Sequence, residues 1–229
     1  MDSRTFGRVT LTLPGLDEPG LHLSNVQSLD GGRGAVQDFQ YADADLRMLD
    51  LADTQLLRGR VTDLRTGRAS LDQLQLNSIE FSGCDFGSAQ WRKSKLSRVA
   101  FRNCKIMGGA LDALTLDDVL FENCKLDYTA FSGLRATGPV VFSQCVLTEA
   151  SFTECDLTDA VFDGCTLRLT EFAKGRYKGL DLRGNDLSSL LGVARLSKVL
   201  IDRAQQFELA QALLTELDVT YGEDLDELR

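Results

Sequence analysis

The sequence predicts a solenoid, a rod of short stacked repeats, and three observations lead to that fold class. An apolar residue recurs at every fifth position over most of the chain, as at Leu46, Leu51 and Leu56, and a small or apolar residue such as Ala44 often stands two positions earlier. No Asp, Glu, Lys or Arg between residues 20 and 187 occupies either slot, as expected if both point into a core where an unpaired charge is costly. A period of five fits neither the helical period of 3.6 nor the strand period of 2, so it indicates a repeat architecture.

The repeated motif is similar to that of a known family. The stretches "ADADLRMLDLADTQL", "LTEASFTECDLTDAVFDGCTL" and "LDLRGNDLSSL" carry a loose A(D/N)Lxx repeat. Over roughly residues 20–190 the chain resembles the pentapeptide-repeat proteins. The resemblance implies an all-β solenoid, namely a right-handed quadrilateral parallel β-helix with four pentapeptides in each coil of 20 residues. Residues 21–190 would then form the β-helix, with about eight coils.

Phe and Cys recur together at this coil length. The segments FSGC, FRNC, FENC, FSQC and FDGC follow one another at 20 or 21 residues. Equivalent positions of successive coils stack about 4.8 Å apart, the ordinary strand spacing. The resemblance therefore implies two structural ladders on neighbouring faces, formed by Phe81, Phe101, Phe121, Phe142 and Phe162, and by Cys84, Cys104, Cys124, Cys145 and Cys165.

The period has one interruption. One extra residue enters between Phe131 and Phe142. Pro139 in this segment has no N–H for a strand ladder and Gly138 allows unusual dihedral angles, so we expect a bulge there. Thr66 is a polar exception on an inward slot, although the register is the same on both sides of it.

The two ends depart from the repeat. Residues 1–20 fit it poorly and are predicted to form an N-terminal cap, with a possible short strand at "RVTLTL". Residues 191–229 change to a helical period, with Asp202 as a candidate N-cap, and this module should cover the open end of the solenoid. In the family such a module often also mediates a two-fold dimer, so the resemblance implies a homodimer. The dimerisation residues would be Phe207, Ala210, Leu214 and Leu217, followed by an acidic tail, "YGEDLDELR".

The residues that could support catalysis do not form a site in the sequence. The spacing of the cysteines equals the coil length rather than the short spacings of a metal site, which favours their packing as small buried apolar side chains over a redox or metal role. The one histidine, His22, has no group of acidic residues or cysteines near it in the sequence that could form a catalytic site with it. We therefore expect no enzyme, no cofactor and no metal. The start of the chain lacks the pattern of a secretory signal and no apolar run reaches the length of a membrane span, so a cytoplasmic protein with reduced thiols is predicted.

Charge is unevenly distributed along the chain. The net charge is −9, which disfavours direct binding to nucleic acid or to an anionic membrane. Residues 20–107 hold 10 acidic and 12 basic side chains, whereas residues 108–187 hold 13 acidic and 7 basic ones. The C-terminal half therefore carries a candidate acidic partner-binding surface, formed by Glu122, Asp127, Glu149, Glu154, Asp156, Asp159 and Asp163. We interpret the arginine-rich segment Arg58–Arg68 as a solvent-exposed face. The alternative is that it binds a partner.

Two functions fit these observations. Well-known members of the family bind DNA gyrase and protect it from inhibitors, so the resemblance implies a non-enzymatic, DNA-mimicking partner of gyrase that could confer antibiotic resistance. The alternative is an interaction scaffold with a different protein partner.

Overall fold

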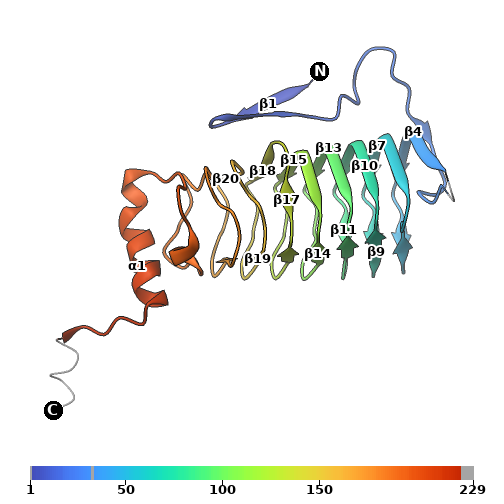
Figure 1. Ribbon diagram of the computed structural model, residues 1–229. Helices are drawn as coiled ribbons and strands as arrows, with labels where there is room; N and C mark the ends of the chain where they lie inside the picture. Colours follow the sequence, from blue (N-terminus) through green and yellow to red (C-terminus); the bar gives the residue numbers. More distant parts are fainter. Residues whose placement is uncertain (1, 32–33, 223–229) are drawn as a thin grey trace.

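The protein forms a parallel β-solenoid of about seven turns that ends in one short helix (Figure 1). The computed structural model describes residues 2–31 and 34–222. Three parallel sheets run along the rod. Within the described residues, no helix is long and apolar enough to cross a membrane.

Long strands supply two of the four sides of each coil. A positive φ near the middle of each long strand, such as 56° at Ser78, divides it between a first and a second side. The strands of this sheet are β3 (Ser24–Asn25), β4 (Ala35–Ala42), β7 (Gln55–Thr62), β10 (Gln75–Ser82), β13 (Lys95–Arg102), β15 (Thr115–Glu122), β17 (Arg135–Ala136), β18 (Val140–Ser143) and β20 (Val161–Asp163).

Short strands supply the other two sides. The third side contains β5 (Asp45–Leu46), β8 (Arg65–Thr66) and β11 (Asp85–Phe86), continued by isolated bridges such as Lys105 to Lys125. The fourth side contains β6 (Leu49–Asp50), β9 (Ala69–Asp72), β12 (Gln90–Arg92), β14 (Ala110–Asp112), β16 (Ala130–Ser132), β19 (Ser151–Thr153) and β21 (Glu171–Phe172).

Residues with positive φ form the corners between the sides. Asp63, Asn103 and Asn123, for example, have φ of 52°, 55° and 53°. Asp, Asn and Gly enter this left-handed region more readily than other residues because their side chains are short and polar or absent. The recurrence of these residue types at outward positions therefore helps the chain to turn after each pentapeptide.

Aromatic rings stack through the interior. Neighbouring rings of the predicted phenylalanine ladder, from Phe81 to Phe162, have centroids 5.0, 4.8, 4.9 and 4.7 Å apart and are nearly parallel. A second stack of Phe131, Phe152 and Phe172 has centroid separations of 4.6 and 5.3 Å. The two stacks meet edge to face, for example between Phe142 and Phe152. Thr66 is one of several polar residues at inward positions, and its buried hydroxyl has no hydrogen-bond partner in the structure.

The one-residue interruption lies where the sequence places it. Leu116 of β15 pairs with Ala136 at a spacing of 20, whereas Val119 of the same strand pairs with Val140 at a spacing of 21. The extra residue thus falls in the segment that contains Gly138 and Pro139. Gly138 lies close to the carboxylate of Asp117, so a larger residue at this position would force the Asp117 side chain to move.

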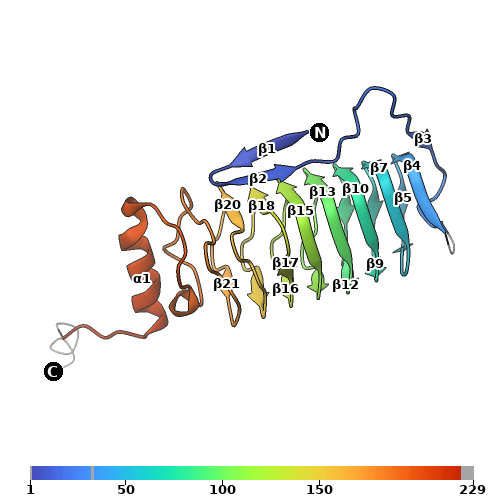
Figure 2. The same cartoon turned by 45° about the horizontal axis from the view of Figure 1, so that its top comes forward.

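The N-terminal segment does not cap the end of the rod, in contrast to the prediction for residues 1–20. Strands β1 (Ser3–Phe6) and β2 (Val9–Thr12) form an antiparallel hairpin that lies along the flank of the solenoid, beside β15, β18 and β20 (Figures 1 and 2). At the N-terminal end of the rod, β3 pairs with β4 at a spacing of only 15 residues, Ser24 with Phe39. The first coil is therefore one pentapeptide short. The rod has about seven turns, one fewer than the eight predicted.

An apolar strip on the outside of the rod explains the position of the hairpin. Ala100, Leu120, Val141 and Val161 occupy outward positions on the second side of successive coils, and all four are buried. Phe6, Leu11 and Leu13 of the N-terminal segment pack against them. We call these four residues the outer strip, and the hairpin Ser3–Thr12 the strap.

The C-terminal module covers the last coil. It consists of the 3-10 turns η1 (Val193–Arg195) and η2 (Arg203–Gln205) and the helix α1 (Gln206–Glu216). Asp202 caps η2, the turn that leads into α1, through a capping box with Gln205. Ala212 is buried and Leu209 and Leu213 pack on the core. Of the predicted acidic tail, residues 223–229 lie outside the described residues.

Candidate protein-binding surfaces

The outward face of α1 is an exposed apolar surface. Phe207 is 78% exposed, Leu217 60% and Leu214 39%, and Ala210 is exposed beside them. Val219 and Tyr221 lie next to these side chains and help to line a shallow hollow of about 340 Å³. Because the opposite face of α1 already packs on the last coil, the predicted dimerisation residues are left for contact with another molecule.

The seven predicted partner-binding carboxylates lie around the whole circumference of the rod. Glu122 and Asp163 are on the second side, in β15 and β20. Asp156 is on the first side, where it bridges to Arg135 and Arg176. The other four lie on the third side or at corners, namely Asp127, Glu149, Glu154 and Asp159. The structure brings only Glu154 and Asp156 together, around a depression of about 590 Å³ that Arg135, Lys174 and Arg176 also line.

Four of the seven carboxylates form ion pairs. Glu122 accepts hydrogen bonds from both Arg4 of the strap and Arg102 of the preceding coil. The other three pair with a base on the following coil: Glu149 with Arg168 at 4.0 Å, Glu154 with Lys174 at 3.1 Å, and Asp156 with Arg176 at 3.2 Å. Asp127, Asp159 and Asp163 form no ion pair with the part of the chain that the structure describes. Among the seven, these last three residues are therefore the ones whose charge no neighbouring base matches.

The pKa of Asp156 illustrates the effect of such a pair. Partial burial raises this pKa, but hydrogen bonds from Thr158 and the charge of Arg176 outweigh it, so the pKa lies below its ordinary value. Asp156 is therefore ionised at neutral pH, with its charge largely matched by Arg176.

The arginine-rich segment is partly neutralised in the same way. Arg58 pairs with Asp38 at 2.7 Å, and Arg60 pairs with both Asp17 and Glu80 at 3.1 Å. These contacts favour a solvated structural face over a free basic site for Arg58 and Arg60.

The cysteines are all buried and carry free thiols. Each Sγ–H donates to backbone carbonyl groups, as Cys124 does to Phe101 and Glu122 at 3.4 Å. Burial raises the pKa of Cys155 to about 11, which keeps its thiol protonated. In the described residues no group of three or more His, Cys, Asp or Glu side chains could hold a metal ion, and His22 is exposed.

A protein-family comparison decides the classification. A family model described as "Pentapeptide repeat region" matches residues 74–138 and 114–190, together more than half of the chain. The chain belongs to the pentapeptide-repeat family. This protein therefore shares the repeat solenoid of a family of scaffold proteins that are generally non-enzymatic.

A comparison with solved structures returns QnrB1 and HetL at low identity and with TM-scores below 0.5. A trypsin-treated variant of QnrB1, a plasmid-mediated fluoroquinolone resistance protein, is 15% identical, with 78% of this chain and 100% of that chain covered and a TM-score of 0.46. Full-length QnrB1 is also 15% identical, with 75% and 99% covered and a TM-score of 0.41. HetL from the cyanobacterium Nostoc, involved in heterocyst differentiation regulation, is 16% identical, with 74% and 89% covered and a TM-score of 0.21. A comparison with curated proteins finds no match.

The outer strip and its strap were not found by sequence reasoning, although the sequence contains a signal for them. Outward positions of a pentapeptide-repeat protein are usually polar, yet Ala100, Leu120, Val141 and Val161 recur at the coil length on one side. Such a row must be covered by another apolar surface. The alternation of Val9, Leu11 and Leu13 marks the segment that covers it.

The packing of the cysteines leads to a testable expectation. Because all six thiols are buried and hydrogen-bonded, we expect the native protein to react with an excess of a thiol reagent far more slowly than the denatured protein. Mass spectrometry of labelled protein, with and without guanidinium chloride, measures this difference. Rapid labelling of three or more cysteines in the native state would contradict the buried ladder.

Proposed function

We propose that the protein is a non-enzymatic, homodimeric binding solenoid whose acidic C-terminal half occupies a basic, DNA-binding surface of DNA gyrase. The observation that supports this proposal is the excess of acids in residues 108–187, where Asp127, Asp159 and Asp163 form no ion pair with any of the described residues. These three carboxylates lie on different sides of the rod. A DNA duplex likewise presents charge on all sides of a rod.

The electrostatics of such a contact favour fast and salt-dependent binding. A net charge of −9 steers the protein toward a basic groove. A base of the same chain that pairs with a carboxylate, as Arg176 does with Asp156, reduces the short-range attraction between that carboxylate and a basic binding partner. The unpaired carboxylates should therefore contribute most of the short-range attraction.

The dimer extends this surface. Two copies that meet through Phe207, Ala210, Leu214 and Leu217 would join their C-terminal ends and place both acidic halves next to the junction. The exposed face of α1 supports this arrangement because it is apolar and has no covering segment within the described residues.

An interaction scaffold with a different protein partner is the second candidate. It is favoured by the ion pairs of Glu122, Glu149, Glu154 and Asp156, which leave less free negative charge than the sequence alone indicates.

Matched charge variants test the gyrase proposal. In the first variant, Asp127, Asp159 and Asp163 are replaced by Asn, and we expect gyrase to bind it about tenfold or more weakly, because charge-assisted contacts are typically worth about 1.5–3 kcal/mol each. The control replaces Asp43, Asp53 and Asp63 by Asn, which removes the same charge from the N-terminal half at corners that Asn tolerates. Affinity is measured by surface plasmon resonance at low and high salt.

The two outcomes separate the candidates. Equal weakening by both variants would indicate a general charge effect and remove the C-terminal half as the binding site. No binding of the wild type to gyrase at low salt leaves the scaffold as the surviving function.

A further inference from the structure

The strap is attached to the solenoid by side chains and not by strand pairing. β1 and β2 pair only with each other and form their own two-stranded sheet. Its apolar residues form a cluster with the outer strip that is separate from the main core. Loss of the strap would therefore leave the interior stacks of the solenoid unchanged.

Two polar contacts fix the strap near its middle and its base. The guanidinium of Arg4 pairs with Glu122, and the backbone N–H of Thr12 donates to Oδ1 of Asp118 at 2.8 Å. Both acceptors belong to β15, directly beside Leu120 of the outer strip. The polar contacts thus set the register in which an apolar hairpin lies on the strip.

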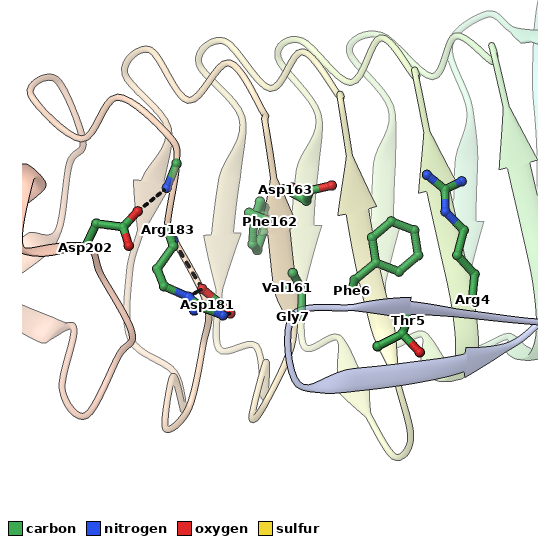
Figure 3. Close-up of a pocket in the computed structure, with 11 residues that line it drawn as sticks. Arg4, Thr5, Phe6, Gly7, Val161, Phe162, Asp163, Asp181, Arg183 and Asp202 are labelled. Atoms are coloured by element: carbon green, nitrogen blue, oxygen red, sulfur yellow. Dashed lines mark hydrogen bonds and ion pairs between the residues drawn. The ribbon is translucent and has the colours of Figure 1, made fainter.

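The tip of the strap lies between two hollows. A hollow of about 480 Å³ lies beside Gly7, between the strap and the residues Asp163, Asp181 and Arg183 (Figure 3). A second hollow of about 480 Å³ lies beside Arg8 and Val9 of the tip. With open space on both sides, the tip is held by the apolar contacts of Phe6 and Val9 with the outer strip and by the close approach of Gly7 to Arg183.

The connecting segment limits how much of the chain can move with the strap. Residues 13–23 contain no strand and include Pro14, Gly15, Pro19 and Gly20. The segment has no strand pairing, but the burial of Leu13 and Leu16 and the ion pair of Asp17 with Arg60 anchor it to the solenoid, so movement is confined to the strap that precedes it. Once lifted, the strap would uncover four aligned apolar residues, a surface that requires another cover.

We propose that the outer strip is a second binding face of this protein, specific for a short amphipathic β-hairpin, and that the strap of a second copy can replace the chain's own strap on it. The second copy is the occupant that the structure supports, because its strap carries the same Phe6 and Leu11 for the strip and the same Arg4 for Glu122. The chain's own strap is favoured by its tether, which gives it a high effective concentration. Exchange therefore requires a weakened strap or a high protein concentration. This face is on the flank of the rod and is distinct from the outward face of α1.

A peptide-binding experiment on the full chain tests this exchange. The probe is a fluorescent synthetic peptide with the sequence of residues 2–13, and the protein carries Phe6→Asp and Leu11→Asp, which detach its own strap. We expect the peptide to bind this variant on the order of tenfold or more tightly than it binds the wild type, whose tethered strap competes. Adding Leu120→Asp should remove peptide binding, whereas adding Met107→Asp, at an exposed position off the strip, should leave it unchanged.

Three results would overturn the proposal. The first is no peptide binding to the folded double variant, and the second is equal binding to wild type and variant. The third is a double variant that loses the cooperative unfolding of the solenoid, because the strap would then be an integral part of the fold. Hydrogen exchange on the wild type provides an independent check: strap amides should exchange on the order of a hundredfold faster than those of β13 and β15, and equal protection would contradict a detachable strap.

Discussion

Replacing Phe121 by Ala is expected to lower the free energy of unfolding by about 3–5 kcal/mol, because it opens a cavity in the middle of the ring stack. The ring of Phe121 lies between those of Phe101 and Phe142, with centroids 4.8 and 4.9 Å away, and is almost fully buried. Each coil contacts only its neighbours, so the loss weakens both interfaces of one coil. Guanidinium denaturation followed by circular dichroism measures the change.

A matched control distinguishes the loss of core packing from a general sensitivity of the protein to substitution. Met107→Ala removes an exposed apolar side chain one coil earlier and should change the free energy by only about 0.5 kcal/mol or less. A loss below about 1 kcal/mol for Phe121→Ala would contradict the importance of the stack.

If the protein is the proposed dimer, replacing Phe207 by Glu is expected to convert it to a monomer at micromolar concentration. A charge at the centre of an apolar interface must be buried without a partner, which costs several kcal/mol and lowers the affinity by orders of magnitude. Because Phe207 points away from the solenoid, thermal unfolding of the rod should be little changed. Light scattering should give a mass near the 25.2 kDa of one chain.

The control for this substitution is Gln206→Glu, which adds the same charge at an exposed neighbouring position outside the apolar stripe. It should leave the mass of the dimer unchanged. A wild-type protein that is already monomeric at micromolar concentration, or a Phe207→Glu variant that remains dimeric, would refute the proposed interface.

The repeat could be predicted from sequence because the demand for an apolar residue at each inward slot recurs at a fixed spacing along the chain. The inward slot at Phe121 has equivalents at Phe101 and Phe142, and one coil length relates them. The interruption was also visible, because the extra residue near Pro139 shifts every later slot by one. A solenoid makes such prediction possible since contacts between coils follow directly from the period.

The position of the strap could not be predicted in this way. Its contact between Leu11 and the outer strip joins residues about 90 or more positions apart, and the period carries no information about them. The coil period could have indicated the ion pairs of Glu154 with Lys174 and of Asp156 with Arg176, because each joins residues 20 positions apart. The pair of Glu122 with Arg4 could not be predicted, since it depends on the strap. Whether Glu122 faces Arg102 alone or also Arg4 depends on where the strap lies, so the free charge of the candidate binding surface could be judged only from the structure.

The proposed function is tested most directly by DNA supercoiling with purified gyrase in the presence of a quinolone. If the protein binds gyrase in place of DNA and protects it, adding the wild type should restore supercoiling that the quinolone inhibits, and high salt should weaken the effect because the contact is electrostatic. The variant with Asn at Asp127, Asp159 and Asp163 should restore markedly less supercoiling than the wild type. Supercoiling that is equally inhibited with and without the wild-type protein, together with no binding at low salt, would contradict the account.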